Sequence, residues 1–145
     1  MTIEWGGLGL QSNMTNQVLD NTAAPATVLD SGLPFTINAN WNVPPGIAAL
    51  LNAGHQFRLR TYAESFGNGQ EQQIGPTVNV PAVPNQLNYG PVAINVNPNP
   101  LQGEGQGAPP VSGVYKIVTV LQLLNGGATE DSGFAEGPVI MMRTP

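Results

Sequence analysis

The chain has no cysteine, and only 9% of its 145 residues are charged. Without cysteine it has no disulfide, no thiolate nucleophile and no thiolate metal site. Long soluble helices usually carry Glu, Lys and Arg on the side exposed to water, and four basic residues cannot supply such a surface repeatedly. We therefore expect very little helix.

Basic residues are also too few for an anionic polymer. The four of them are scattered along a chain of formal net charge −5. A nucleic-acid interface needs a stripe of Lys and Arg that neutralises successive phosphates. We predict that neither nucleic acid nor an anionic membrane is a partner.

Signals for targeting or membrane insertion are missing as well. Residues 1–4 have no basic start followed by an apolar stretch, so no secretory signal is visible, and no run approaches the ~18 apolar residues of a membrane span. We expect no membrane insertion, and the cytoplasm is the default compartment.

Few residues could carry catalysis. The only histidine, His55, stands at the start of a predicted strand, where we interpret it as an exposed or loop-edge residue. The carboxylates that could pair for acid–base chemistry or hold calcium lie at strand ends or in turn-like segments: Glu64, Glu71, Glu130, Asp131 and Glu136. No nucleophile elbow is present. We predict no catalytic residue, no cofactor and no metal.

What the chain has in place of charge is neutral polarity and apolar residues. It contains 18 Gly and 14 Pro, and 41% of its residues are hydrophobic, which is enough for a core. Its length is that of one domain, so we assign residues 1–145 to a single domain.

The hydrophobic pattern is that of β-strands. Residues 35–43 and 56–64 alternate between apolar and polar positions, and residues 114–123 form the strongest apolar strand. Shorter strands are predicted at 77–83, 92–97 and 138–143, and within 2–10, 16–20 and 26–29. The prolines around 77–83 and 92–97 place these two at a sheet edge. Seven to nine short strands predict an all-β, antiparallel β-sandwich.

Two other segments connect these strands. Residues 46–53 have a Pro-rich entry and apolar residues at helical spacing, which predicts one short helical turn that closes an end of the sandwich with Ile47, Leu50 and Leu51. Residues 97–110 are rich in Gly and Pro and have no periodicity, which predicts a long, exposed, mobile loop.

One short stretch resembles a known family. The sequence Gly113-Val114-Tyr115 at the start of the 114–123 strand is similar to the Gly-x-Tyr entry to the penultimate strand of immunoglobulin-like domains. The resemblance implies an immunoglobulin-like architecture, with Tyr115 bonded back to upstream backbone and Ile117 at the position of the family's cysteine. It implies no particular function.

The last two predicted strands are apolar on both faces. Val118 and Val120 alternate with the core residues of one strand, and Val139 and Met141 alternate with those of the other. If one face packs against the core, the opposite face needs a cover. That cover is either the chain's own N-terminal segment or a partner.

These observations favour a non-catalytic structural or protein-interaction domain, as a subunit or docking module of a larger assembly or homo-oligomer. Its partner-binding residues would be Val118, Val120, Val139 and Met141. The alternative is a carbohydrate-binding module, because amides match sugar hydroxyls and exposed aromatic rings stack on sugars, with Tyr62, Tyr89 and Trp5 as candidates. An enzyme would require two acids, or His55 and an acid, to converge in one pocket.

Overall fold

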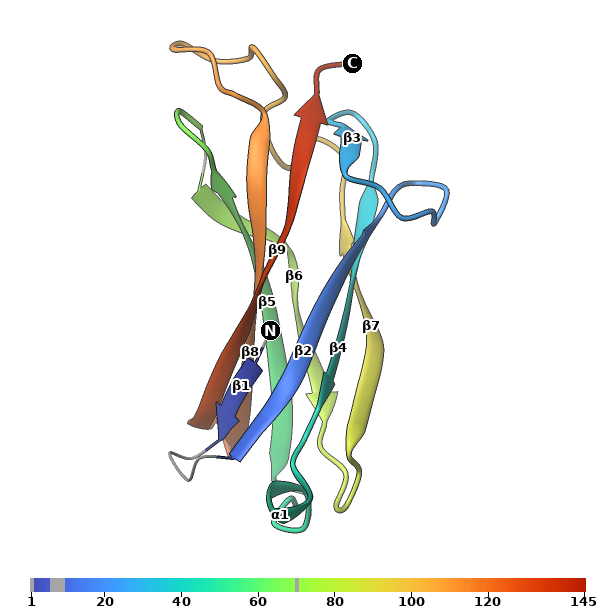
Figure 1. Ribbon diagram of the computed structural model, residues 1–145, viewed down its shortest axis with the longest axis vertical. Coiled ribbons are helices and arrows are strands. Elements are labelled where there is room, and N and C mark those ends of the chain that lie inside the picture. Colours follow the sequence, from blue (N-terminus) through green and yellow to red (C-terminus); the bar gives the residue numbers. More distant parts are fainter. Residues whose placement is uncertain (1, 6–9, 70) are drawn as a thin grey trace.

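The protein is a sandwich of two β-sheets, seen in a computed structural model that describes residues 2–5, 10–69 and 71–145. The four-stranded sheet has the order β1 (Thr2–Trp5), β2 (Leu10–Leu19), β4 (Phe35–Asn42) and β7 (Asn88–Val96). The five-stranded sheet has the order β3 (Val28–Asp30), β9 (Ala128–Arg143), β8 (Val114–Asn125), β5 (His55–Ser65) and β6 (Glu71–Pro81). The predicted all-β sandwich is confirmed (Figure 1).

Strand pairing is antiparallel with one exception. The short edge strand β3 runs parallel to β9, with Val28 opposite Met141. Among the described strands, this edge pair is the one departure from the predicted antiparallel arrangement. The long connection from β3 to the last strand allows the parallel direction, which a tight hairpin does not.

The core lies between the two sheets and is built by alternation. On β8, Tyr115, Ile117 and Leu121 point inward and are fully or almost fully buried. An aromatic cluster fills the end near the helical turn: Trp41 and Tyr89 stack with ring centroids 5.4 Å apart, and Phe57 meets both edge-on. Such pairs add geometric specificity to apolar burial.

Several strands begin earlier than the sequence pattern indicates, among them β6 and β9. Strand β6 starts at Glu71 and β9 at Ala128, and the first parts of both strands are held by backbone pairing with β5 and β8. The sequence pattern misses these parts because they are polar, contain glycine and show no apolar alternation. The two strands that the prolines were expected to place at an edge do lie at edges, β6 in one sheet and β7 in the other. The edge prediction is confirmed, although the two strands do not share a sheet.

The only helix among the described residues is α1 (Pro45–Ala48), which is shorter than the predicted 46–53 turn and closes one end of the sandwich (Figure 1). Ile47 and Leu51 are buried there as expected, whereas Leu50 is exposed. In the part of the chain that the structure describes, no helix is long and apolar enough to cross a membrane.

The loop before β8 is tied to the sandwich. The Tyr115 hydroxyl donates to the Gln102 carbonyl at 2.7 Å, which confirms that this tyrosine bonds back to upstream backbone. The N–H of Glu104 donates to the Met142 carbonyl at 2.9 Å, and Leu101 is buried in the core. The loop is therefore not exposed along its whole length, contrary to expectation.

Candidate functional site

The four predicted contact residues share one surface. They lie on the side of the five-stranded sheet that faces away from the core, here called the outer face: Val118, Val120, Val139 and Met141. Their exposure differs. Val139 has 47% of its surface exposed, Val120 and Met141 are half-buried, and Val118 is only 9% exposed.

The N-terminal segment does not cover this surface. Strand β1 pairs with β2 in the other sheet, and its Ile3 is buried inside the sandwich against Gly133 of β9. Residues 6–9, which also belong to the expected cover, lie outside the described residues. Among the described residues, the outer face is covered by no other strand of the chain.

Two further apolar side chains on the outer face were not predicted. Phe134, opposite Val120 on β9, is 48% exposed, and Val28, opposite Met141 on β3, is 50% exposed. Phe134 lies in the polar part of β9 that shows no strand pattern. The one signal in the sequence is the charged residue Glu136, two positions after Phe134. In an extended strand both side chains lie on the same face, so the charge of Glu136 indicates that Phe134 also faces solvent.

The outer face also gathers the basic residues that are scattered in the sequence. Arg58 and Arg60 point outward from β5, Lys116 from β8 and Arg143 from the end of β9. The Lys116 ammonium lies 3.4 Å from Glu64 and 3.6 Å from Glu136. The hydrogen bond to Glu64 and the charge of Glu136 raise the pKa of Lys116.

His55 is the first residue of β5 and so lies at a loop edge, as one of the two predicted alternatives has it, but it is not exposed, so the other alternative is wrong. Its side chain is 8% exposed, with Nδ1 accepting from the Asn52 N–H at 3.1 Å and Nε2 lying 3.0 Å from the Glu130 carboxylate. Asn125 donates to the other Glu130 oxygen at 3.0 Å. His55 and an acid therefore do meet, but both ring nitrogens are engaged within the protein, and the contact joins the start of β5 to the β8–β9 hairpin.

The remaining carboxylates do not converge with His55. Glu64 and Glu136 lie beside Lys116 on the outer face, and Glu71 lies opposite Glu64 on the same face. Asp131 stands opposite Leu123 in the β8–β9 hairpin. Within the described ranges, no group of three or more His, Asp or Glu side chains is placed to hold a metal ion.

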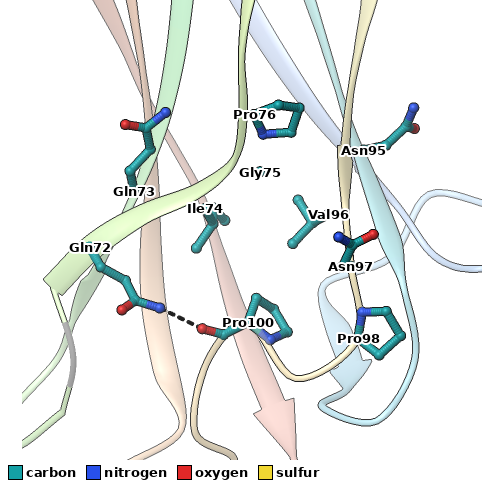
Figure 2. A pocket seen from close by; sticks show the side chains of 10 residues that line it. All are labelled: Gln72, Gln73, Ile74, Gly75, Pro76, Asn95, Val96, Asn97, Pro98 and Pro100. Atoms are coloured by element: carbon teal, nitrogen blue, oxygen red, sulfur yellow. Dashed lines mark hydrogen bonds between the residues drawn. The ribbon is translucent and has the colours of Figure 1, made fainter.

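A cleft of about 570 Å³ opens between the edge strands β6 and β7. Figure 2 shows Ile74 and Val96 facing each other across it, with amides and prolines around them and a hydrogen bond from Gln72 to the Pro100 carbonyl. The amides in its lining are those of Gln72, Gln73, Asn95 and Asn97. The cleft is uncharged and has no aromatic residue in its lining.

The three candidate sugar-stacking residues do not form one platform. Tyr62 is half-buried on the outer face, whereas Tyr89 is buried in the aromatic cluster and its hydroxyl is bonded to the backbone of Val83. The side chain of Trp5 lies outside what the structure describes. Tyr89 is therefore unavailable for stacking on a sugar.

The fold defines the protein as an all-β sandwich whose five-stranded sheet has a partly apolar outer face that no other described strand covers. No family model, curated protein or solved structure matches the chain.

Proposed function

We propose that the chain is a non-catalytic protein-interaction domain that docks through the outer face of its five-stranded sheet, as a subunit of an assembly. One observation carries the proposal: Val28, Phe134 and Val139 stand about half-exposed on a single sheet face. Exposed apolar side chains gathered on one surface, among polar and charged ones, are typical of protein contact sites.

The engagement of His55 supports the non-catalytic part of the proposal. A general base needs a nitrogen within reach of a substrate proton. Here Nδ1 accepts a backbone N–H and Nε2 faces Glu130, so a substrate would have to break one of these hydrogen bonds. These two hydrogen bonds favour a structural role for His55, which connects β5 to the β8–β9 hairpin.

Site-specific photo-crosslinking in the native host tests the proposal. A benzophenone amino acid at Val139 is expected to yield a protein adduct, because this position lies within the proposed contact. The matched control is Asn38, which alternates with buried Ile37 and Ala39 on the opposite sheet and faces outward. Equal labelling at both positions, or none at Val139, would contradict the proposal.

The amide-lined cleft supports a second candidate, the binding of a neutral glycan. Asn and Gln side chains both donate and accept hydrogen bonds, as sugar hydroxyls do, and the cleft has the size of a small-ligand site. Titration calorimetry with neutral oligosaccharides tests it. Binding should be lost in N97A, which removes an amide from the lining of the cleft, and kept in N38A, which removes an amide outside the cleft.

A further inference from the structure

Two asparagines in the chain are followed directly by glycine. Asn68 precedes Gly69 in the loop between β5 and β6, and Asn125 precedes Gly126 where β8 turns into β9. All four residues are exposed. Because glycine has no Cβ to shield its own backbone nitrogen, the side chain of a preceding asparagine can reach that nitrogen. The two sites therefore share the same reacting groups and the same access to water.

At Asn125 both reacting groups are held by hydrogen bonds. The side-chain amide nitrogen Nδ2 donates to the Glu130 carboxylate at 3.0 Å. The N–H of Gly126 donates to the Gly54 carbonyl at 3.1 Å. A covalent bond between the Asn125 side chain and the Gly126 nitrogen can form only after both hydrogen bonds have been broken.

At Asn68 neither reacting group is held. Among the described residues, the side chain of Asn68 and the N–H of Gly69 have no hydrogen-bond partner, and only the Asn68 carbonyl is bonded, accepting from the Ser65 hydroxyl at 3.0 Å. Gly69 has φ +148°, and a Cβ added there would overlap the Ser65 hydroxyl. The loop conformation therefore requires the same glycine that leaves Asn68 open to reaction.

We propose that Asn68 is a site of spontaneous covalent modification and that Asn125 is protected from it. The backbone nitrogen of Gly69 attacks Cγ of Asn68 and closes a five-membered succinimide ring. The bond from Cγ to Nδ2 breaks, and the amide nitrogen leaves as ammonia, which takes the proton of the Gly69 N–H. Water then adds to one of the two ring carbonyls and opens the ring to aspartate or isoaspartate. Nothing is oxidised or reduced, and water is the only co-reactant.

The modification adds charge to a part of the surface that is already acidic. The loop joins Glu64 to Glu71, which lie opposite each other on β5 and β6. A carboxylate at position 68 adds one negative charge to the formal net charge of −5. Isoaspartate also lengthens the main chain of the loop by one carbon. The modified chain should therefore separate from the unmodified chain on an anion-exchange column.

Ageing of the folded, full-length chain at mildly alkaline pH, followed by peptide mapping with mass spectrometry, tests the proposal. Asn68 should convert at least about tenfold faster than Asn125, because Asn125 must first give up a hydrogen bond to a charged group. The product at position 68 should contain both aspartate and isoaspartate. Equal rates at the two asparagines, or no product at position 68, would overturn the proposal, and aspartate without isoaspartate would exclude the ring.

Unfolding the chain is the first control. In guanidinium chloride the hydrogen bonds of Asn125 and Gly126 are lost, so the two asparagines should convert at similar rates. Conversion of Asn68 should change little between the folded and the unfolded chain, whereas that of Asn125 should rise at least about tenfold. If unfolding accelerates both asparagines equally, the loop protects Asn68 as well, and the proposal fails.

Two variants test the individual groups. E130A removes the partner of the Asn125 amide, so conversion at Asn125 should become faster while that at Asn68 stays the same. N68Q should abolish the product at position 68, because glutamine would have to close a less favourable six-membered ring. Circular dichroism checks that both variants fold. An unchanged rate at Asn125 in folded E130A would show that the hydrogen bond to Glu130 does not protect it.

Discussion

Tyr115 and Gln102 are joined by a partly buried hydrogen bond in which the phenol donates to the main-chain carbonyl, with 2.7 Å between the two oxygens. The bond fixes the loop before β8 onto the strand that supports the outer face. Burial raises the pKa of Tyr115, so the phenol keeps its proton to a higher pH than an exposed tyrosine.

Replacing this tyrosine by phenylalanine should destabilise the protein. Y115F removes the donor and keeps the ring, so we expect a loss of about 1–2 kcal/mol in the free energy of unfolding. Urea denaturation measures it. Y62F is the control, because the Tyr62 hydroxyl makes no hydrogen bond within the described ranges, and its stability should stay within ~0.5 kcal/mol of the unmodified chain. Equal stability of Y115F and Y62F would contradict the anchoring role.

A second prediction concerns a pair of hydroxyls inside the core. Thr61 and Thr119 are fully buried on neighbouring strands, with their hydroxyl oxygens 3.1 Å apart. T61V or T119V alone leaves one buried hydroxyl without its partner and should cost about 1–2 kcal/mol. The double variant T61V/T119V removes both, so its loss should be smaller than the sum of the two single losses. Strictly additive losses in a double-mutant cycle would show that the two hydroxyls do not interact.

A third prediction separates steric from conformational cost at two glycines. Gly75, where β6 comes close to β7, has φ +71°, and an added Cβ would lie 2.8 Å from Ile94. Gly126 in the β8–β9 turn has φ +59°, with no atom within 4 Å of an added Cβ. G126A should therefore cost only about 1 kcal/mol, the penalty for positive φ. G75A should cost clearly more in the same thermal-denaturation series, and equal losses would exclude the close approach.

Much of the fold is readable from the sequence because most strands have one dry face. Period-two alternation locates β4, β5 and β8 within a few residues, and it places Arg58 and Arg60 on the same side of β5. Polar stretches of β6 and β9 give no such signal, because backbone pairing rather than apolar burial holds them in the sheet. The sandwich could therefore be predicted, but not the full length of its strands.

The outer face depends on register, which alternation alone does not give. The pairing of β8 with β9 shifts between Lys116 and Val118, so that Glu136 and Val139 both point outward although one number is even and the other odd. A bulge of this kind breaks the period of two. The four apolar residues could thus be named in advance, whereas the acidic group around Lys116 could not.

The last prediction is an acid-dependent loss of stability at the β8–β9 hairpin. Because Nδ1 of His55 accepts the Asn52 N–H, the proton of the neutral ring lies on Nε2 and is donated to Glu130. The hydrogen bonds from Asn125 and then from His55 lower the pKa of Glu130 below its ordinary value of 4.5.

A lowered pKa in the folded state means that the unfolded chain takes up this proton more readily. The contribution of Glu130 to stability is therefore present above its unfolded pKa and is lost as the pH falls through its folded pKa. E130Q removes the titrating group, so its free energy of unfolding should fall less steeply than that of the unmodified chain between about pH 5 and about pH 3. Urea denaturation at a series of pH values measures both slopes.

E104Q, which removes an exposed carboxylate from the loop before β8, should keep the slope of the unmodified chain. If E130Q also keeps that slope, the hydrogen bonds from Asn125 and His55 do not stabilise the carboxylate in solution, and the connection between β5 and the hairpin does not depend on its charge.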